Sequence, residues 1–372
     1  MKDVRVKDVT EKLEAWAPLS LAEAWDNPGL TVGNPESLIS GVVTSLDITP
    51  QVVDRAKEVG ANFIVSHHPY IFKGMKQITL TTAHGRLIAD LLKHDISIYA
   101  MHTNLDIVSG GLNDEAVKRL GLENTDVLDK TGQEDFVKLR VFVPELEADK
   151  VRQAIGNAGA GAIGNYSHCS FSVTGTGRFL PLRGAHPAIG QVEILTNVRE
   201  EEISVVVPRP VLSKVVKEML AVHPYETPAY EVVSLDVPHK AYGLGRIGSF
   251  AQALSFDDFK ERVQEAFPQA HLRLGGHKCQ CIQRIALCTG GGAEFIDKAA
   301  SLGADAYITG DVKYHDMQRA KELGLLVVDA GHFGTEEMAA KLLAGKIKEA
   351  LGQLGRPDIE VEAFSEQRDF FF

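Results

Sequence analysis

The chain has 372 residues, 44% of them hydrophobic and 24% charged, and a formal net charge of −11. Single hydrophobic cores stop growing below this length, so we expect two or three domains. The acidic balance disfavours a broad binding surface for nucleic acid or an anionic membrane. No apolar run approaches the roughly 18 residues of a membrane span, and residues 1–5 carry charges where a secretion signal is apolar. Four cysteines in no disulfide or zinc pattern indicate reduced thiols and a cytoplasmic protein.

Residues 1–132 alternate between strand and helix patterns. The runs at 41–47, 63–65 and 96–100 predict strands, and the segments 49–59, 83–93 and 111–120 predict helices. The first helix begins with Thr49 as its N-cap and Pro50 at the first helical position. This alternation predicts a mainly parallel or mixed sheet covered by helices.

Residues 133–240 follow a different order. Strands are predicted at 136–144, 169–173, 191–195, 202–208 and 230–235, with helices at 147–158 and 211–220. Two β-α-β units in series predict a ferredoxin-like α+β domain. Because candidate site residues lie on both sides of it, we interpret this segment as an insertion.

Residues 241–372 return to the earlier pattern. Strands are predicted at 284–288, 306–311 and 325–330, helices at 315–323 and 335–351, and a glycine turn at 289–293 before a further helix. The terminal segments read as related halves. The predicted fold class is therefore α/β, with two similar α/β halves that form one unit and a ferredoxin-like α+β insertion between them.

Three polar patches each follow a hydrophobic strand-like run. They are Ser66-His67-His68-Pro69, His102-Thr103-Asn104-Leu105-Asp106 and His332-Phe333-Gly334-Thr335-Glu336. Strands of an α/β fold deliver such residues to one edge of the sheet. A single histidine at a strand end is more often structural, but three such patches favour a metal site.

Imidazole and carboxylate ligands suit Zn, Mn, Fe, Co or Ni as divalent ions, and the ligand types do not choose among them. Neighbouring residues of an extended chain point to opposite faces, so His67 and His68 suit two ions rather than one. Asp106 and Glu336 have enough oxygens to bridge such a pair. His332 and Glu336 share a helix face if the helix begins at His332.

Other polar positions allow two interpretations each. Residues Gly290 to Gly292 either cradle a phosphate or form a plain tight turn, which is the commoner case. Asp26 and Asn27, in Trp25-Asp26-Asn27-Pro28-Gly29-Leu30, either reach a pocket or cap a turn. The junction Gly310-Asp311-Val312-Lys313-Tyr314-His315-Asp316 either faces the metals, with Lys313 and His315 holding an anionic substrate, or is a solvated helix start with Asp311 as N-cap.

The combination of these motifs with Gly331-His332-x-x-Thr335-Glu336 resembles the Nif-three-like dinuclear metal centre family, whose members are named GTP cyclohydrolase 1 type 2 homologues. The resemblance covers nearly the whole chain. It implies His67, His68, Asp106, His332 and Glu336 as ligands of two divalent transition-metal ions per chain, with His102 beside them. It also implies a toroidal homohexamer, a trimer of dimers. The middle segment, with His223-Pro224-Tyr225-Glu226-Thr227-Pro228, resembles the small trimeric signalling and divalent-ion-tolerance proteins, and we expect that motif to serve packing and trimer contact.

The expected activity is metal-dependent hydrolysis of a nucleotide or a phosphorylated small molecule, with GTP ring opening implied by the resemblance alone. His102 is the candidate general acid or base. The alternative is a non-catalytic hexamer that binds or senses metal and docks a partner. We expect no membrane partner, and the net charge disfavours nucleic acid.

Overall fold

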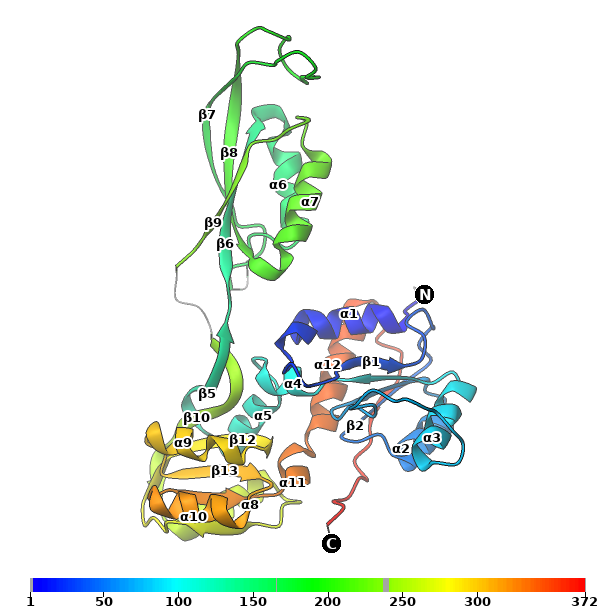
Figure 1. Ribbon diagram of the computed structural model, residues 1–372, viewed down its shortest axis with the longest axis vertical. Helices are drawn as coiled ribbons and strands as arrows, with labels where there is room; N and C mark the ends of the chain where they lie inside the picture. The colour runs from blue at the N-terminus through cyan, green and yellow to red at the C-terminus, as the bar shows by residue number, and fades with distance from the viewer. Residues whose placement is uncertain (1–2, 165, 237–240, 372) are drawn as a thin grey trace. The chain divides into compact units, whose positions relative to one another are not determined.

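The computed structural model describes residues 3–164, 166–236 and 241–371, which divide into two compact units (Figure 1). Unit 1 comprises residues 1–132 and 242–372, and unit 2 comprises residues 133–241. None of the helices in the described ranges is long and apolar enough to cross a membrane.

The first sheet of unit 1 has the order β1-β4-β3-β2-β15. The strands are β1 (Gly29–Val32), β2 (Val42–Ser45), β3 (Phe63–Ser66), β4 (Ser97–Ala100) and β15 (Val361–Ala363). β1 is antiparallel to β4, and the other four strands are parallel. β2, β3 and β4 are buried along their whole length, which is typical of strands covered on both faces.

The second sheet of unit 1 has the order β11-β14-β13-β12-β10-β5. The strands are β5 (Glu123–Gln133), β10 (Ala241–Leu254), β11 (Arg273–Gly276), β12 (Ile282–Gly291), β13 (Ala306–Gly310) and β14 (Leu326–Asp329). β12, β13 and β14 are parallel. Thus β15, from the C-terminal segment of the chain, joins the first sheet, and β5, from the N-terminal segment, joins the second sheet.

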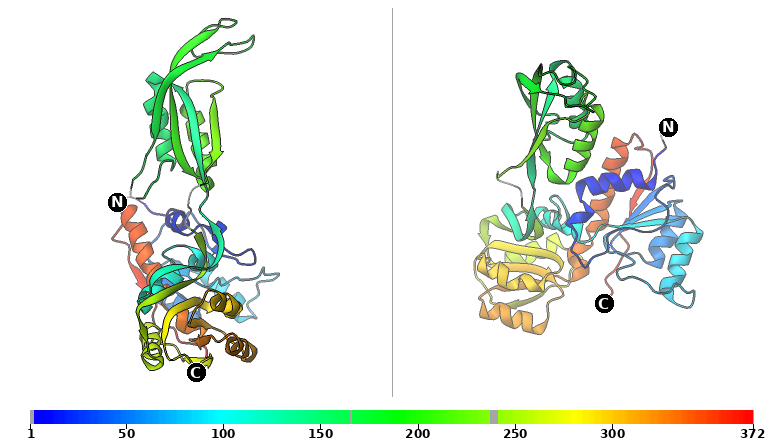
Figure 2. Two further views of the ribbon diagram at one scale, coloured as in Figure 1. Left: turned by 90° about the vertical axis from the view of Figure 1, so that its left-hand side faces the viewer. Right: turned by 45° about the horizontal axis from the view of Figure 1, so that its top comes forward.

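Helices cover both sheets. They are α1 (Val6–Trp16), α2 (Pro50–Glu58), α3 (Ala83–Lys93), α4 (Thr103–Ile107), α5 (Leu112–Leu120), α8 (Phe256–Ala266), α9 (Ile296–Ser301), α10 (Tyr314–Glu322), α11 (His332–Glu336) and α12 (Ala339–Gln353), with 3-10 turns η1 (Leu19–Leu21) and η4 (Ala293–Phe295). α12 lies between the two sheets (Figures 1 and 2). One continuous core joins apolar residues of α1, α5, α8, α12 and both sheets, so the two halves share their main core. The sequence-based expectation of an α/β fold is confirmed.

Unit 2 contains a four-stranded antiparallel sheet of order β7-β8-β6-β9. Its elements are β6 (Phe136–Pro144), η2 (Glu145–Glu147), α6 (Ala148–Asn157), β7 (Phe171–Phe179), β8 (Thr196–Pro208), η3 (Arg209–Val211), α7 (Leu212–Val222) and β9 (Tyr230–Ser234). The β-α-β-β-α-β order is that of a ferredoxin-like domain. Alternate residues of β6 and β8 pack on α6 and α7 in a separate core, so both helices cover one face of the sheet.

Several elements, among them α1, β5, β10 and α8, were not predicted, and three predicted elements have a different conformation. The strand predicted at 191–195 is a turn, because Glu193 has a φ of 62° and its amide donates to the Pro181 carbonyl oxygen. The predicted glycine turn at 289–293 begins as strand, since β12 continues to Gly291. The helix predicted at 335–351 is two helices, α11 and α12. The Thr335 hydroxyl donates to the carbonyl oxygens of Gly331 and His332, a contact that bends helices.

Candidate metal centre

Six side chains from the three predicted patches lie together within unit 1, at the carboxyl ends of β3, β4 and β14. They form three groups in which the potential ligand atoms all lie within 4.8 Å of one another. The groups are His67, Asp106 and Glu336; His68, His332 and Glu336; and His67, His68 and His102. We call these six residues the cluster. Parallel strands bring them together because their carboxyl ends meet at one edge of each sheet.

His67 is fully buried and is oriented by one backbone contact. Its Nδ1 lies 2.7 Å from the carbonyl oxygen of Met101. A carbonyl oxygen only accepts, so Nδ1 carries a proton and Nε2 faces the cluster. Nε2 lies 3.8 Å from Asp106 Oδ1 and 3.6 Å from Glu336 Oε1. Metal-ligating histidines are held in this way, by a hydrogen bond from the ring nitrogen that faces away from the ion.

Glu336 lies at the centre of the cluster and is almost wholly buried. Its Oε2 is 2.9 Å from Nε2 of His68 and 3.2 Å from Nε2 of His332, while Oε1 faces His67. Each of its oxygens therefore belongs to a different group of potential ligands. α11 makes this possible, because it begins at His332 and places residues 332 and 336 on one face.

Two further carboxylates hold the outward nitrogens of the histidines around Glu336. Asp47 Oδ1 lies 2.8 Å from Nδ1 of His68, and Asp311 Oδ2 lies 2.8 Å from Nδ1 of His332. Asp311 reaches this position with a φ of 57°, in a region that costs non-glycine residues on the order of 1 kcal/mol or more. The alternative that Asp311 is the N-cap of α10 is wrong, since Lys313 occupies that position.

His102 is fixed by Asp26. Its Nδ1 lies 2.7 Å from Asp26 Oδ1, and the other carboxylate oxygen accepts from the backbone and the hydroxyl of Thr103. Burial alone would raise the pKa of Asp26, but the hydrogen bonds from His102 and Thr103 outweigh it and lower the pKa to about 2. An ionised Asp26 only accepts, so the His102 proton sits on Nδ1 and Nε2 faces His67 and His68.

The acidic side chains control the charge of the imidazoles. Burial by itself lowers the pKa of His68 and of His332, but their carboxylate partners outweigh burial and raise the values to about 10 and about 9. Burial favours the neutral form of Glu336 too, yet the charges of His67 and His332 hold its pKa well below the ordinary value. Burial raises the pKa of Asp106. The cluster therefore attracts positive charge strongly, and a divalent cation would compete with protons for it.

Two buried atoms test whether a metal ion fits these residues. In the described part of the chain, His67 Nε2 and Asp106 Oδ1 are buried and lack a hydrogen-bond partner. Leaving a buried polar atom unpaired costs about 1–3 kcal/mol, so such atoms call for an explanation. A cation between them would satisfy both, and imidazole nitrogen and carboxylate oxygen are its ordinary ligands. The residues fit a metal ion.

Gly290 lies directly against the cluster. A Cβ at this position would collide with Glu336 Oε1 and lie 3.3 Å from Nε2 of His332. The Gly290 amide donates to the Thr335 hydroxyl, which ties the end of β12 to α11. This glycine thus leaves space for Glu336 and His332. The two interpretations from the sequence, a phosphate-binding loop and a tight turn, did not include this role.

Two exposed aromatic rings flank His102. Trp25 is 59% exposed and Phe72 is 40% exposed. Their ring centroids lie 6.1 Å and 6.2 Å from that of His102, both edge-on, and 5.9 Å from each other. Trp25 precedes Asp26, which holds His102, so its place beside the cluster is fixed by the same turn.

The three predicted pocket residues have other contacts. The Asn27 side-chain amide donates to the Ile71 carbonyl oxygen, which joins the Trp25 turn to the Phe72 loop. Lys313 starts α10 with its amide donating to Asp316, and His315 is exposed with Nδ1 3.3 Å from Gln318 Oε1. In the ranges that the structure describes, we find no contact between Asn27, Lys313 or His315 and the cluster. Their role in a pocket stays a prediction.

Sequence reasoning placed Asp26 and Asp311 in motifs that could reach the site, but it did not pair them with His102 and His332, and it did not single out Asp47. The available signal was their position, because each lies beside a motif or at the end of a predicted strand. A carboxylate, a backbone carbonyl oxygen or a water molecule ordinarily binds the outward nitrogen of a metal-ligating histidine.

Comparison with known proteins identifies the family to which this chain belongs. Residues 4–369 match the family model described as Duf34/NIF3 (NGG1p interacting factor 3). The chain belongs to the Duf34/NIF3 family. The resemblance inferred from the motifs is confirmed.

Named relatives and a solved structure of the family match over at least 90% of their length. A protein of Halalkalibacterium halodurans named GTP cyclohydrolase 1 type 2 homolog is 41% identical, with 100% of this chain and 99% of the relative covered. The Bacillus subtilis protein of the same name is 39% identical over 91% of this chain and 90% of its own. A Bacillus cereus crystal structure, of a protein related to NIF3, superimposes with a TM-score of 0.89 at 37% identity and covers 100% of both chains.

Proposed function

We propose that the cluster holds two divalent transition-metal ions. His67 and Asp106 would bind one ion, His68 and His332 would bind the other, and Glu336 would give one oxygen to each. The observation that supports this is the pair of overlapping groups that share Glu336, with His67 Nε2 and Asp106 Oδ1 unpaired at its side.

We further propose that the protein is a metal-dependent hydrolase that acts on a nucleotide or a phosphorylated small molecule. Paired divalent ions lower the pKa of water and stabilise charge that develops on the attacked group. The relatives' name, GTP cyclohydrolase 1 type 2 homolog, supports GTP as the first substrate to test. The exposed faces of Trp25 and Phe72 support a substrate with a flat ring, because aromatic rings stack on such surfaces.

In this proposal, the residues around the metal ligands have different roles. His102 carries protons at Nε2, because Asp26 fixes its Nδ1 proton and stabilises the ring when it becomes charged. Asp47 and Asp311 orient His68 and His332 and increase their basicity as ligands. Lys313 and His315 remain proposed contacts for an anionic group.

For the assembly we propose a cytoplasmic homohexamer arranged as a trimer of dimers, and a molar mass six times that of the chain in solution would support it. Sedimentation equilibrium of the untagged protein measures that mass. A monomer or dimer would remove the proposal.

Elemental analysis tests the metal centre. We expect about two transition-metal ions per chain in protein purified without chelator, and a loss of both in a His67→Ala/His68→Ala variant. His94→Ala, at an exposed histidine of α3's C-terminal end, is the matched control and should retain metal. Metal content that is near zero, or unchanged in the double variant, would overturn the site.

Turnover tests the hydrolase. GTP and a nucleotide panel are assayed with protein loaded with Mn²⁺, Zn²⁺ or Fe²⁺, beside His68→Ala. We expect His102→Gln to retain its metal but to lose roughly 10²-fold in kcat, the usual contribution of a proton carrier. Metal binding without turnover above the His68→Ala background would instead favour a protein that stores or senses metal.

A further inference from the structure

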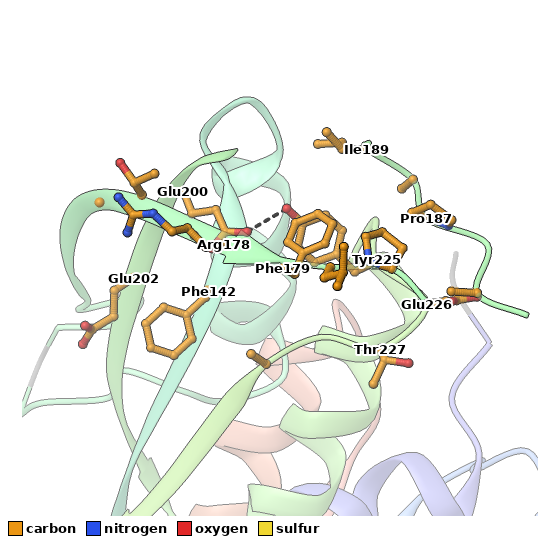
Figure 3. Close-up of a pocket in the computed structure, with 18 of the residues that line it drawn as sticks. Phe142, Arg178, Phe179, Pro187, Ile189, Glu200, Glu202, Tyr225, Glu226 and Thr227 are labelled. Atoms are coloured by element: carbon orange, nitrogen blue, oxygen red, sulfur yellow. Dashed lines mark hydrogen bonds between the residues drawn. The ribbon is translucent and has the colours of Figure 1, made fainter. Parts of the chain in front are cut away.

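Two features of the molecule lie outside the metal centre and its proposed chemistry. The first is a hollow of about 550 Å³ on the sheet of unit 2, where the Tyr225 hydroxyl donates to Glu200 (Figure 3). Tyr225, Glu226 and Thr227, from the motif expected to make trimer contact, line this hollow, so the proposed hexamer accounts for it. The second is the segment that follows β15, residues 364–371, which has no role in the proposed function.

This C-terminal segment continues the pairing of β15 beyond the end of the strand. The Phe364 amide donates to the Thr44 carbonyl oxygen at 2.8 Å, and the Phe364 side chain is buried. Further along, the Gln367 side chain takes over. Its Oε1 lies 2.8 Å from the Leu46 amide nitrogen and 3.3 Å from that of Asp47, and its Nε2 lies 3.1 Å from the Asp47 carbonyl oxygen. One side chain thus binds three backbone groups.

The chemistry of glutamine explains why it suits this position. β15 pairs with β2 as far as Ala363 and Thr44. A primary amide both donates and accepts, like the peptide group of a strand, so the Gln367 side chain supplies the hydrogen bonds that a further strand residue would make. Leu46 is buried, and a buried backbone amide needs such a partner in place of water.

The backbone that Gln367 holds leads directly to the metal centre. Asp47 Oδ1 lies 2.8 Å from Nδ1 of His68. The His68 amide also donates to the Leu46 carbonyl oxygen at 2.9 Å, and the His67 amide donates to the Ser45 carbonyl oxygen at 3.1 Å. Residues 45–47 therefore lie between the two histidines on one side and the C-terminal segment on the other.

We propose that Gln367 is a positioning residue for the metal centre. It fixes the backbone of Asp47, so that the Asp47 carboxylate holds His68 in the orientation of a ligand. This inference rests on the proposed function and assigns Gln367 to one of the two ions, the one at His68, His332 and Glu336. The ion at His67 does not depend on Gln367, because the Met101 carbonyl oxygen orients that ring.

Co²⁺ titration of the metal-free, full-length protein by calorimetry tests the proposal. Gln367→Met keeps the length of the side chain and removes its hydrogen-bonding groups. Since supporting partners of a ligand histidine contribute 10–100-fold in metal affinity, we expect one ion to bind roughly tenfold more weakly and the other to bind unchanged. The visible absorption of bound Co²⁺, which reports its ligand geometry, should change for the weakened ion. Glu366→Met, at the exposed neighbouring position, is the matched control and should bind both ions like the unmodified protein.

A double-mutant cycle identifies the route. If Gln367 acts through Asp47, the effects of the two substitutions on metal affinity are not additive. Asp47→Ala should weaken the same ion, and Gln367→Met should add little in that background. Losses that add in full would show that Gln367 acts by another route and would overturn the proposal.

Hydrogen exchange of the unmodified protein tests the same link without a substitution, and it decides the outcome if Gln367→Met fails to fold by circular dichroism. Coupling between two sites is reciprocal, so bound metal must strengthen the Gln367 contact as much as that contact strengthens metal binding. Peptides covering residues 364–371 should exchange more slowly with Co²⁺ than after chelator treatment, and equal exchange would overturn the proposal.

The outcomes separate this inference from the proposed function. Two ions in the unmodified protein, bound with the same affinities in Gln367→Met, would reject the role of Gln367 and leave the metal centre intact. An unmodified protein that binds no Co²⁺ would reject the metal centre and this inference together.

Discussion

At the scale of single residues, the candidate metal centre depends on a glycine, because a side chain at that position would collide with a proposed ligand. Gly290 has a φ of 68° and lies where a Cβ would collide with the Glu336 carboxylate. Glycine meets both demands, since it has no Cβ and tolerates the left-handed region.

We predict that Gly290→Ala loses metal. The methyl group must displace Glu336, and the backbone strain adds a cost on the order of 1 kcal/mol or more. Elemental analysis and thermal unfolding measure the two effects. Gly345→Ala, in α12 with open space around the new Cβ, is the matched control and should retain its metal. Full metal content in Gly290→Ala would contradict the geometry around Glu336.

His223 predicts a pH dependence of unit 2. Burial lowers its pKa below the ordinary 6.5, although the hydrogen bond to Phe142 and the charge of Glu200 act in the opposite direction. Below pH 6.5, His223 is therefore protonated in the unfolded chain but stays neutral in the folded unit until the pH reaches its lowered pKa. Stability is complete above pH 6.5 and falls as the pH decreases from there towards the lowered pKa.

Hydrogen exchange of peptides covering β6 and the 223–230 turn, corrected for intrinsic rates, measures this loss between pH 7 and pH 5. A His223→Gln variant keeps a polar side chain that does not titrate and should show a flat profile. The same pH dependence in both proteins would assign the effect to another group.

At the scale of elements, one arginine ties the C-terminal half of unit 1 to the N-terminal half. Arg246 of β10 is 5% exposed and pairs with both oxygens of Asp114 on α5, at 2.6 Å and 3.0 Å. It also donates to the carbonyl oxygens of Gly243, Gly245 and Val108. Its guanidinium is satisfied within the interface between strand and helix.

We predict that Arg246→Met destabilises unit 1 by about 3 kcal/mol, because it leaves the Asp114 carboxylate without its cation and takes one donor away from each of three carbonyl oxygens. Urea unfolding followed by tryptophan fluorescence reports on this unit, since Trp16 and Trp25 are the chain's two tryptophans and both lie in it. Arg284→Met, at an exposed position of β12, should cost less than about 1 kcal/mol. An equal effect of the two substitutions would argue against a structural role for the Arg246 pair.

At the scale of the whole molecule, the proposed ligands come from both ends of the chain, and all of them lie in unit 1. Strands β5 and β10, which lead into and out of unit 2, are neighbours in one sheet. Gly132 lies against the Tyr242 ring, so the two ends of unit 1 meet where residues 133–241 begin and end.

We therefore predict that residues 133–241 are removable. A chain in which a short Gly-Ser linker joins Gly132 to Tyr242 should fold and bind the same amount of metal per chain as the full-length protein. Circular dichroism and elemental analysis measure these two properties. A soluble, folded variant without metal would show that unit 2 is required for the centre.

The sequence by itself predicted many of the strands and helices and the three patches that supply the cluster. The apolar run 63–65, bounded by Gly60 and by a polar patch, indicated a strand. Thr49 was predicted as the N-cap of its helix, and its hydroxyl accepts from the Val52 amide. The patches containing His67, His102 and His332 were recognisable because a residue at the end of a parallel strand has one destination, the carboxyl edge of the sheet.

Only the tertiary structure decided what depends on contacts between distant segments. The exchange of β5 and β15 between the sheets carries no local signal, since β5 has 11 mostly polar residues and β15 has only three, and neither pattern names the strand beside which it lies. The contacts of Asp26, Asp47 and Asp311 with the histidines join residues that are 21 to 76 positions apart in the sequence. The contact between Gly290 and Glu336 lies within the same range. Such contacts follow from how the sheets pack, and packing is a property of the whole core rather than of any segment.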